Sequence, residues 1–101
     1  MNNLELKEKI KEYVLDEEIL DKIVVLEGDE YADGVIGITE DYRLVYSYEK
    51  LIESLMKTYD SKDESIKWLE AVEWLNYNTL RSIPYMESQG LLAPVIIHDI
   101  V

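Results

Sequence analysis

The sequence predicts an α+β fold in which a small antiparallel or mixed sheet packs with three to four helices. Apolar residues recur with a helical period in the first 15 residues and again between residues 48 and 81. Two short β-branched segments lie between these regions, and a third ends the chain. Because no linker-like or low-complexity stretch divides the 101 residues, we expect residues 1–101 to form a single domain.

The N-terminal quarter of the chain is expected to be mainly helical. A helix over residues 4–15 would place four apolar side chains on one face: Leu6, Ile10, Tyr13 and Val14. Asp16 then suits the start of a short second helix, because carboxylates favour the positive end of the helix dipole. Residues 23–26 are compatible with the end of that helix or with a strand, and Gly28 breaks the chain.

The β-branched segments predict a hairpin over about residues 34–48, with strands at 34–39 and 43–48. Gly37 leaves one side of the first strand bare, which indicates either a bulge or a close-packed neighbour. A further strand is expected over about residues 95–100. Its consecutive apolar residues predict burial on both faces and therefore a place inside the sheet.

Two helices are expected between the hairpin and the last strand. The first, over residues 48–59, has an apolar stripe of Leu51, Ile52, Leu55, Met56 and Tyr59. The second, over about residues 62–81, follows a capping box in which Ser61 is the N-cap and Glu64 the third helical residue, and Pro84 ends it. Its broad apolar arc contains Trp68, Leu69, Ala71, Val72, Leu75 and Leu80.

The charge excludes several classes of function. The chain has 22 acidic and 10 basic residues, a net charge of −12, which argues against binding nucleic acid directly or an anionic membrane. It has no cysteine and a single histidine, which argues against thiol catalysis, disulfides, zinc sites and histidine metal centres. With no long apolar run and no signal-peptide pattern, we expect a soluble, cytoplasmic protein without a cofactor.

The excess negative charge is concentrated in one segment. Residues 16–41 contain ten acidic residues and one base, Lys22, a net charge of −9. One interpretation is a solvated surface that keeps the protein soluble; the other is a binding face for a basic protein. The candidate residues of that face are Asp16, Glu17, Glu18, Asp21, Asp29, Glu30 and Asp33.

The long predicted helix carries a second candidate surface. Trp74 lies on its polar side beside Tyr77, and such aromatic pairs are frequent in interfaces. Trp74 could instead pack under a loop or against the N-terminal helix. Asn76 falls inside the apolar arc and would need hydrogen-bond partners there, while Arg81 could bind an anion, pair with an acid or cap the helix.

No motif predicts catalysis. His98 is the one side chain suited to general-base work at neutral pH, but its neighbour Asp99 would point to the opposite face of a strand, so the two do not form a dyad. Asp29, Glu30 and Asp33 could bind Ca²⁺ or Mg²⁺ loosely, although the EF-hand spacing is absent. We therefore expect no metal site and no enzyme.

Three segments carry a family resemblance: residues 33–41 (DGVIGITED), residues 43–46 (RLVY) and residues 73–85 (EWLNYNTLRSIPY). Together they resemble a family of small acidic, mostly uncharacterised proteins encoded by Gram-positive and gut bacteria, their phages and mobile elements. The resemblance covers about residues 30–100. Tyr42 departs from it, because a hairpin glycine is expected there. The resemblance implies a phage-like context, in which small acidic proteins often inhibit host defence, as anti-CRISPR proteins do.

These observations predict a non-enzymatic module that binds a basic host protein, such as a nucleic-acid-binding effector, and occupies its basic groove with carboxylates in place of phosphates. Trp74 and Tyr77 are candidates for an apolar anchor on the partner or for a dimer contact. The alternative is a homodimeric structural or assembly protein without inhibitory activity.

Overall fold

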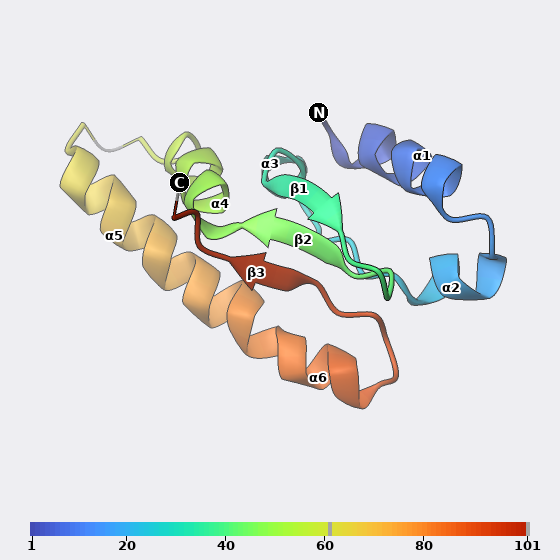
Figure 1. Cartoon of the computed structure of the whole chain (residues 1–101). Coiled ribbons are helices and arrows are strands. Elements are labelled where there is room, and N and C mark those ends of the chain that lie inside the picture. Colours follow the sequence, from blue (N-terminus) through green and yellow to red (C-terminus); the bar gives the residue numbers. More distant parts are fainter. Residues whose placement is uncertain (61, 101) are drawn as a thin grey trace.

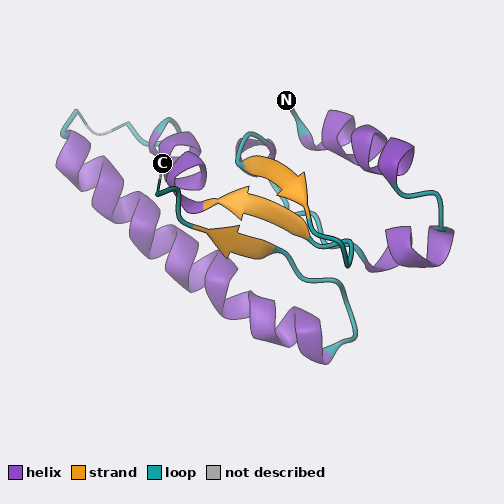
Figure 2. Ribbon diagram, viewed as in Figure 1, coloured by secondary structure: helices purple, strands orange, loops and turns teal. Residues whose placement is uncertain are grey.

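The computed structural model describes residues 1–60 and 62–100 and has the α+β architecture that the sequence predicts (Figures 1 and 2). A three-stranded sheet occupies the middle of the molecule, with the long C-terminal helical segment on one side and the first two helices on the other. Its elements are α1 (Asn3–Tyr13), α2 (Glu17–Lys22), α3 (Asp29–Ala32), β1 (Val35–Ile38), β2 (Leu44–Ser47), α4 (Tyr48–Met56), α5 (Glu64–Trp74), the π-helix η1 (Leu75–Thr79), the 3₁₀-helix η2 (Leu80–Ser82), α6 (Ile83–Ser88) and β3 (Val95–Ile97).

The sheet is mixed and has the order β1-β2-β3. β1 pairs with β2 antiparallel, and β3 pairs with β2 in parallel. The prediction that the C-terminal strand is internal is therefore wrong: β2 is the central strand and β3 an edge. β3 ends at Ile97, whose side chain is exposed, because a run of apolar residues does not reveal how many neighbours a short strand has.

The hairpin contains a bulge, one of the two alternatives that Gly37 indicates. The pairing register shifts between Val35 and Gly37. A Cβ on Gly37 would meet no atom within 4 Å, so this glycine faces open space rather than a close neighbour. In the turn, Tyr42 adopts a left-handed φ of 66°, the conformation for which a glycine was expected, and the Arg43 amide donates to the Thr39 hydroxyl over 2.9 Å.

The first two helices begin as predicted. Asp16 is the N-cap of α2, and its carboxylate accepts hydrogen bonds from the two amides that follow Glu17. Three of the four predicted core residues of α1 are buried, but Tyr13 is exposed. The helix ends at Tyr13, and Val14, with extended backbone, takes the buried position at this end.

The long helix differs from its prediction at both ends. Ser61 lies outside the described residues, and the N-cap is Asp63, which accepts from the Ser65 amide over 2.9 Å. Pro84 does not end the helical segment, which continues to Ser88. A proline is tolerated there because it falls in the first turn of α6, where its missing N–H is not needed.

One hydrophobic core fills the space between the sheet face that carries Leu44 and Tyr46 and the surrounding helices. Of the arc predicted on the long helix, only Ala71 and Leu75 are buried, because α5 contacts the core through a narrow stripe. Asn76 is exposed, so it needs no buried partner. The buried members are Leu6, Ile10, Val14, Leu26, Tyr31, Ala32, Leu44, Tyr46, Leu51, Ile52, Leu55, Ala71 and Leu75.

Candidate functional site

Residues 23–26, which the sequence left undecided between helix and strand, form neither a helix nor a regular strand, and residues 27–28 form a bend. Ile23 makes an isolated parallel bridge with Leu92, and the Val24 amide donates to the Leu92 carbonyl over 3.1 Å. The Leu26 amide donates to the buried Tyr46 hydroxyl over 3.0 Å. Burial raises the pKa of Tyr46 to about 12, against a smaller opposing effect of this hydrogen bond. The hydrogen bond from Leu26 to Tyr46 thus connects the acidic segment, residues 16–41, to the buried core.

Gly28 turns this segment into the single-turn helix α3. Its φ is 108°, a conformation that side chains disfavour. The carboxylate of Glu30 folds over it: a Cβ on Gly28 would lie 2.7 Å from Glu30 Oε1. The sequence reveals Gly28 as a break but does not reveal the helical turn after it, because four residues carry no periodicity.

Tyr31, one residue further, is the centre of a hydrogen-bonded cluster. Its side chain is 6% exposed, and its hydroxyl lies 2.9 Å from Trp74 Nε1 and 3.3 Å from Thr79 Oγ1. Trp74 ends α5, and Thr79 ends η1. Residues five apart are about 140° apart around an α-helix, but π-helical bonds join residues i and i+5 and place them above one another. The π-helix therefore lets both side chains reach one hydroxyl.

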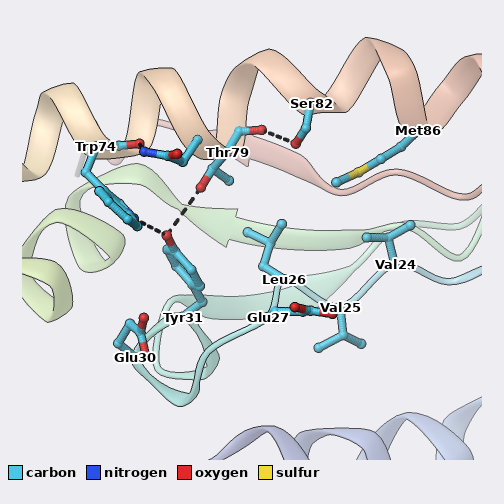
Figure 3. A pocket seen from close by; sticks show the side chains of 11 residues that line it. Val24, Val25, Leu26, Glu27, Glu30, Tyr31, Trp74, Thr79, Ser82 and Met86 are labelled. Atoms are coloured by element: carbon cyan, nitrogen blue, oxygen red, sulfur yellow. Dashed lines mark hydrogen bonds between the residues drawn. The ribbon is translucent and has the colours of Figure 1, made fainter.

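A pocket of about 410 Å³ lies beside this cluster, between residues 24–27 and the helices η1 to α6 (Figure 3). Aromatic and apolar groups make most of its wall, and two carboxylates belong to its lining. Figure 3 shows the helical residues on one side of the pocket and residues 24–27 opposite them. The lining residues are Val24, Val25, Leu26, Glu27, Glu30, Tyr31, Trp74, Asn78, Thr79, Ser82 and Met86. We call this the Tyr31–Trp74 pocket.

The candidate acidic residues separate into two groups. The α2 group contains Asp16, Glu17, Glu18 and Asp21; all four are exposed, and α2 has no buried residue. Apart from the capping bonds of Asp16, no hydrogen bond or ion pair within the described residues involves these carboxylates.

The α3 group contains Asp29, Glu30 and Asp33, and two of these hold the start of α1. Asp29 accepts a hydrogen bond from the Asn3 amide over 2.9 Å, and Asp33 lies 3.0 Å from the Met1 amino group. Hydrogen bonding and charge attraction from Asp33 raise the pKa of that amino group. Since α2 follows the other end of α1, the two groups lie at opposite ends of a helix about 16 Å long (Figure 1).

The two predicted aromatic contacts differ in their surroundings. Trp74 is 48% exposed, and its indole N–H donates to Tyr31 of α3, so the predicted packing under a loop or against the N-terminal helix is wrong. Tyr77 is 70% exposed, and the Arg81 guanidinium lies 5.2 Å from its ring centroid, a cation–π contact. Trp68, which was expected in the core, is 53% exposed.

His98 and Asp99 do not contact each other as a dyad; both contact Glu49 instead. His98 Nδ1 lies 3.3 Å from Glu49 Oε1, and the Asp99 amide donates to Glu49 Oε2 over 3.2 Å. Burial pushes the pKa of Glu49 upward, but hydrogen bonds from Asp99, its own amide and His98 outweigh that effect and leave this pKa below its ordinary value. The Ser47 hydroxyl donates to Asp99, so these residues connect the end of the chain to the start of α4.

Metal binding by Asp29, Glu30 and Asp33 is not supported. Within residues 1–60 and 62–100, no group of three or more Asp, Glu, His or Cys side chains is placed to hold a metal ion. The carboxylates of Asp29 and Asp33 accept hydrogen bonds from groups of the chain itself. In the same part of the chain, no helix combines the length and apolarity needed to cross a membrane.

Comparisons of the chain with family models, with curated proteins and with solved structures find no match. The family resemblance of residues 30–100 therefore stays a prediction. Tyr31 and Thr79 are not among the candidate residues that the sequence pattern predicts. Tyr31 could have been noticed as the one aromatic residue in the acidic segment 16–41, placed between Gly28 and Gly34.

Proposed function

We propose that this protein is a non-enzymatic, cytoplasmic module that binds a basic protein through its acidic segment and occupies a site that otherwise holds nucleic-acid phosphates. The proposal rests on the exposure of the α2 carboxylates and on the absence of cations paired with them within the described residues. Glu17, Glu18 and Asp21 are exposed, no cation pairs with them within the described residues, and Lys22 is the one base between residues 16 and 41.

Repulsion among the exposed carboxylates of the α2 group favours binding of a basic surface. Like charges held close together repel, and that repulsion opposes folding unless something else compensates. α2 packs on the core through the half-buried Ile19 and Leu20, whereas its carboxylates are exposed, contribute nothing to the core and remain available to a partner. A basic surface would relieve the repulsion and would also attract this segment over about a Debye length, 8–10 Å at moderate salt.

The phage-like context implied by the sequence resemblance supports the choice of partner. A host effector that binds DNA or RNA presents the basic groove that such a segment complements. Inhibition of a defence protein, in the manner of anti-CRISPR proteins, is the form of this function that we propose.

The test is a displacement assay. The protein is immobilised, incubated at low salt with a lysate of the bacterium that carries its gene, and the bound proteins are eluted with salt. The purified partner is then mixed with labelled duplex DNA and titrated with the free protein. We expect a basic, DNA-binding partner and loss of its DNA complex. Capture of no basic protein at low salt, or a ternary complex that retains the DNA, would contradict the proposal.

A homodimer is the second candidate, and one observation favours it. Ile66, Trp68 and Leu69 of α5 are all exposed, with Trp68 and Leu69 at 53% and 52%. Exposed apolar residues on one helix are typical of an interface. Sedimentation of the wild type and a Trp68→Ala variant tests this: a dimer that dissociates in the variant supports it, and a monomeric wild type excludes it.

A further inference from the structure

We propose that the Tyr31–Trp74 pocket receives the guanidinium side chain of an arginine residue from the basic partner. This inference rests on the proposed function and specifies how the partner is recognised. It assigns a residue-sized cationic ligand to the pocket, whereas the α2 group supplies charge attraction over a wider surface.

The charge of the pocket selects a cation. Glu27 and Glu30 line it, and within the described residues neither carboxylate forms an ion pair or a hydrogen bond. Both belong to the segment whose net charge is −9, so the local potential repels anions. A guanidinium is the better match than an ammonium, because its planar fork of N–H donors pairs with a carboxylate through two parallel hydrogen bonds and also stacks on aromatic rings.

The apolar and aromatic lining of the pocket matches the aliphatic carbons and the flat guanidinium of an arginine side chain. Val24, Leu26 and Met86 are apolar and would contact its aliphatic carbons, while Trp74 and Tyr31 add aromatic rings of the kind that attract cations. The volume of about 410 Å³ is near the lower end of the range for ligand pockets, about 300–1,000 Å³. The pocket therefore suits one side chain rather than a large ligand.

The hydrogen-bonded cluster fixes one wall of the pocket. The Trp74 N–H donates to the Tyr31 hydroxyl over 2.9 Å, and the Thr79 hydroxyl lies 3.3 Å from the same oxygen. Tyr31 and Thr79 are 6% and 5% exposed, so these bonds are shielded from solvent. The indole of Trp74 is therefore held in place at the pocket, ready to contact a ligand.

The π-helix η1 positions two of the side chains that line the pocket, Trp74 and Thr79. It brings the side chains of both residues to one hydroxyl, that of Tyr31. π-Helical turns are rare and are frequent at functional sites.

A peptide titration tests the inference directly. The probe is N-acetyl-Gly-Arg-Gly-amide, and the control replaces arginine by citrulline, which has nearly the same shape but no charge. The indole N–H signals of Trp74 and Trp68 are followed by NMR, so Trp68 is a reference elsewhere on the molecule. We expect saturable shifts at Trp74, little change at Trp68, and at least about tenfold weaker binding of the citrulline peptide.

Two matched variants identify the carboxylates. Glu27→Gln/Glu30→Gln should weaken the arginine peptide by about tenfold or more, whereas Glu17→Gln/Glu18→Gln, with the same loss of charge outside the pocket, should leave it within about twofold. Equal binding of the two peptides, equal losses in the two variants, or no saturable shift at Trp74 would overturn the inference.

The outcome is separable from that of the displacement assay. DNA displacement without any arginine binding at Trp74 would leave the proposed function in place and remove this pocket from it. Arginine binding without a partner that is displaced from DNA would support the pocket as an arginine site and contradict the proposed function.

Discussion

The α2 and α3 groups of carboxylates contain similar residues but have different structural roles. In the α3 group, Asp29 and Asp33 hold the start of α1, and Glu30 lies over Gly28 at the pocket. In the α2 group, only Asp16 has a structural contact, and the remaining carboxylates are free in the described structure. A cluster of acidic residues in a sequence therefore need not form one surface with one role. Mutations of Asp29 and Asp33 should affect folding, whereas mutations in the α2 group should affect binding of the basic partner.

The largest effect on stability is expected where the acidic segment joins the core. Tyr46→Phe removes the acceptor of the buried Leu26 amide and should lower the free energy of unfolding by about 1–3 kcal/mol at pH 7. Urea unfolding measures it. A loss below about 0.5 kcal/mol would show that Leu26 does not depend on this hydroxyl.

The free energies of unfolding of the wild type and Tyr46→Phe should also depend differently on pH. Burial raises the pKa of Tyr46 to about 12 in the folded state, so the unfolded chain ionises first, near pH 10. Stability is therefore lost as the pH rises from about 10 towards 12, by about 1.4 kcal/mol per unit. Tyr46→Phe lacks this loss, so the difference between wild type and variant should shrink at pH 11. An unchanged difference would contradict the burial of Tyr46.

A smaller effect is expected within the α3 group. Asp29→Ala removes the carboxylate that accepts from the Asn3 amide at the start of α1 and should destabilise the protein by about 1 kcal/mol. Glu27→Ala is the matched control, since Glu27 has no hydrogen bond in the described structure. Chemical denaturation of both variants measures the difference. Equal stability of the two would show that Asp29 does not hold α1.

The smallest effect is expected in the α2 group. Glu18→Gln/Asp21→Asn should change the free energy of unfolding by no more than about 0.5 kcal/mol, because both side chains are exposed and bind nothing in the chain. Because two negative charges are removed, repulsion among the remaining carboxylates falls, and a slight gain in stability is expected. Thermal and urea unfolding check this. A loss above about 1 kcal/mol would show that these two carboxylates stabilise the fold rather than being free for a partner.

Local patterns predicted most of the fold. The apolar spacing on α1 and α4 and the helix start at residues 16–18 depend on neighbouring residues, and the structure confirms them. At Gly37 it selects the bulge from the two alternatives. The place of β3 at the sheet edge depends on contacts between distant segments, which apolar content does not encode. Pro84 was expected to end a helix because the rule for proline in a helix interior was applied, whereas it lies in a first turn.

The candidate site was less predictable for the same reason. The sequence singled out Glu30 and Trp74 separately, but only the fold brings their segments to one pocket. The π-helix that aligns Trp74 with Thr79 has no sequence signature, since its residues would also fit an α-helix. The separation of the acidic residues into two groups follows from the position of α1 between them, which the net charge of residues 16–41 does not contain.

The central claim, that the α2 group binds a basic partner, is tested most directly by two charge reversals of equal size. The partner is the protein that is displaced from DNA in the displacement assay, and its affinity is measured against salt concentration for two variants. One is Glu18→Lys/Asp21→Lys in the α2 group; the other is Glu8→Lys/Glu12→Lys, which changes two exposed side chains of α1. We expect the α2 variant to bind at least about tenfold more weakly at low salt, with a reduced salt dependence, and the α1 variant to stay within about threefold of the wild type. Equal losses in both variants would contradict the claim and would leave the acidic segment as a solubilising surface.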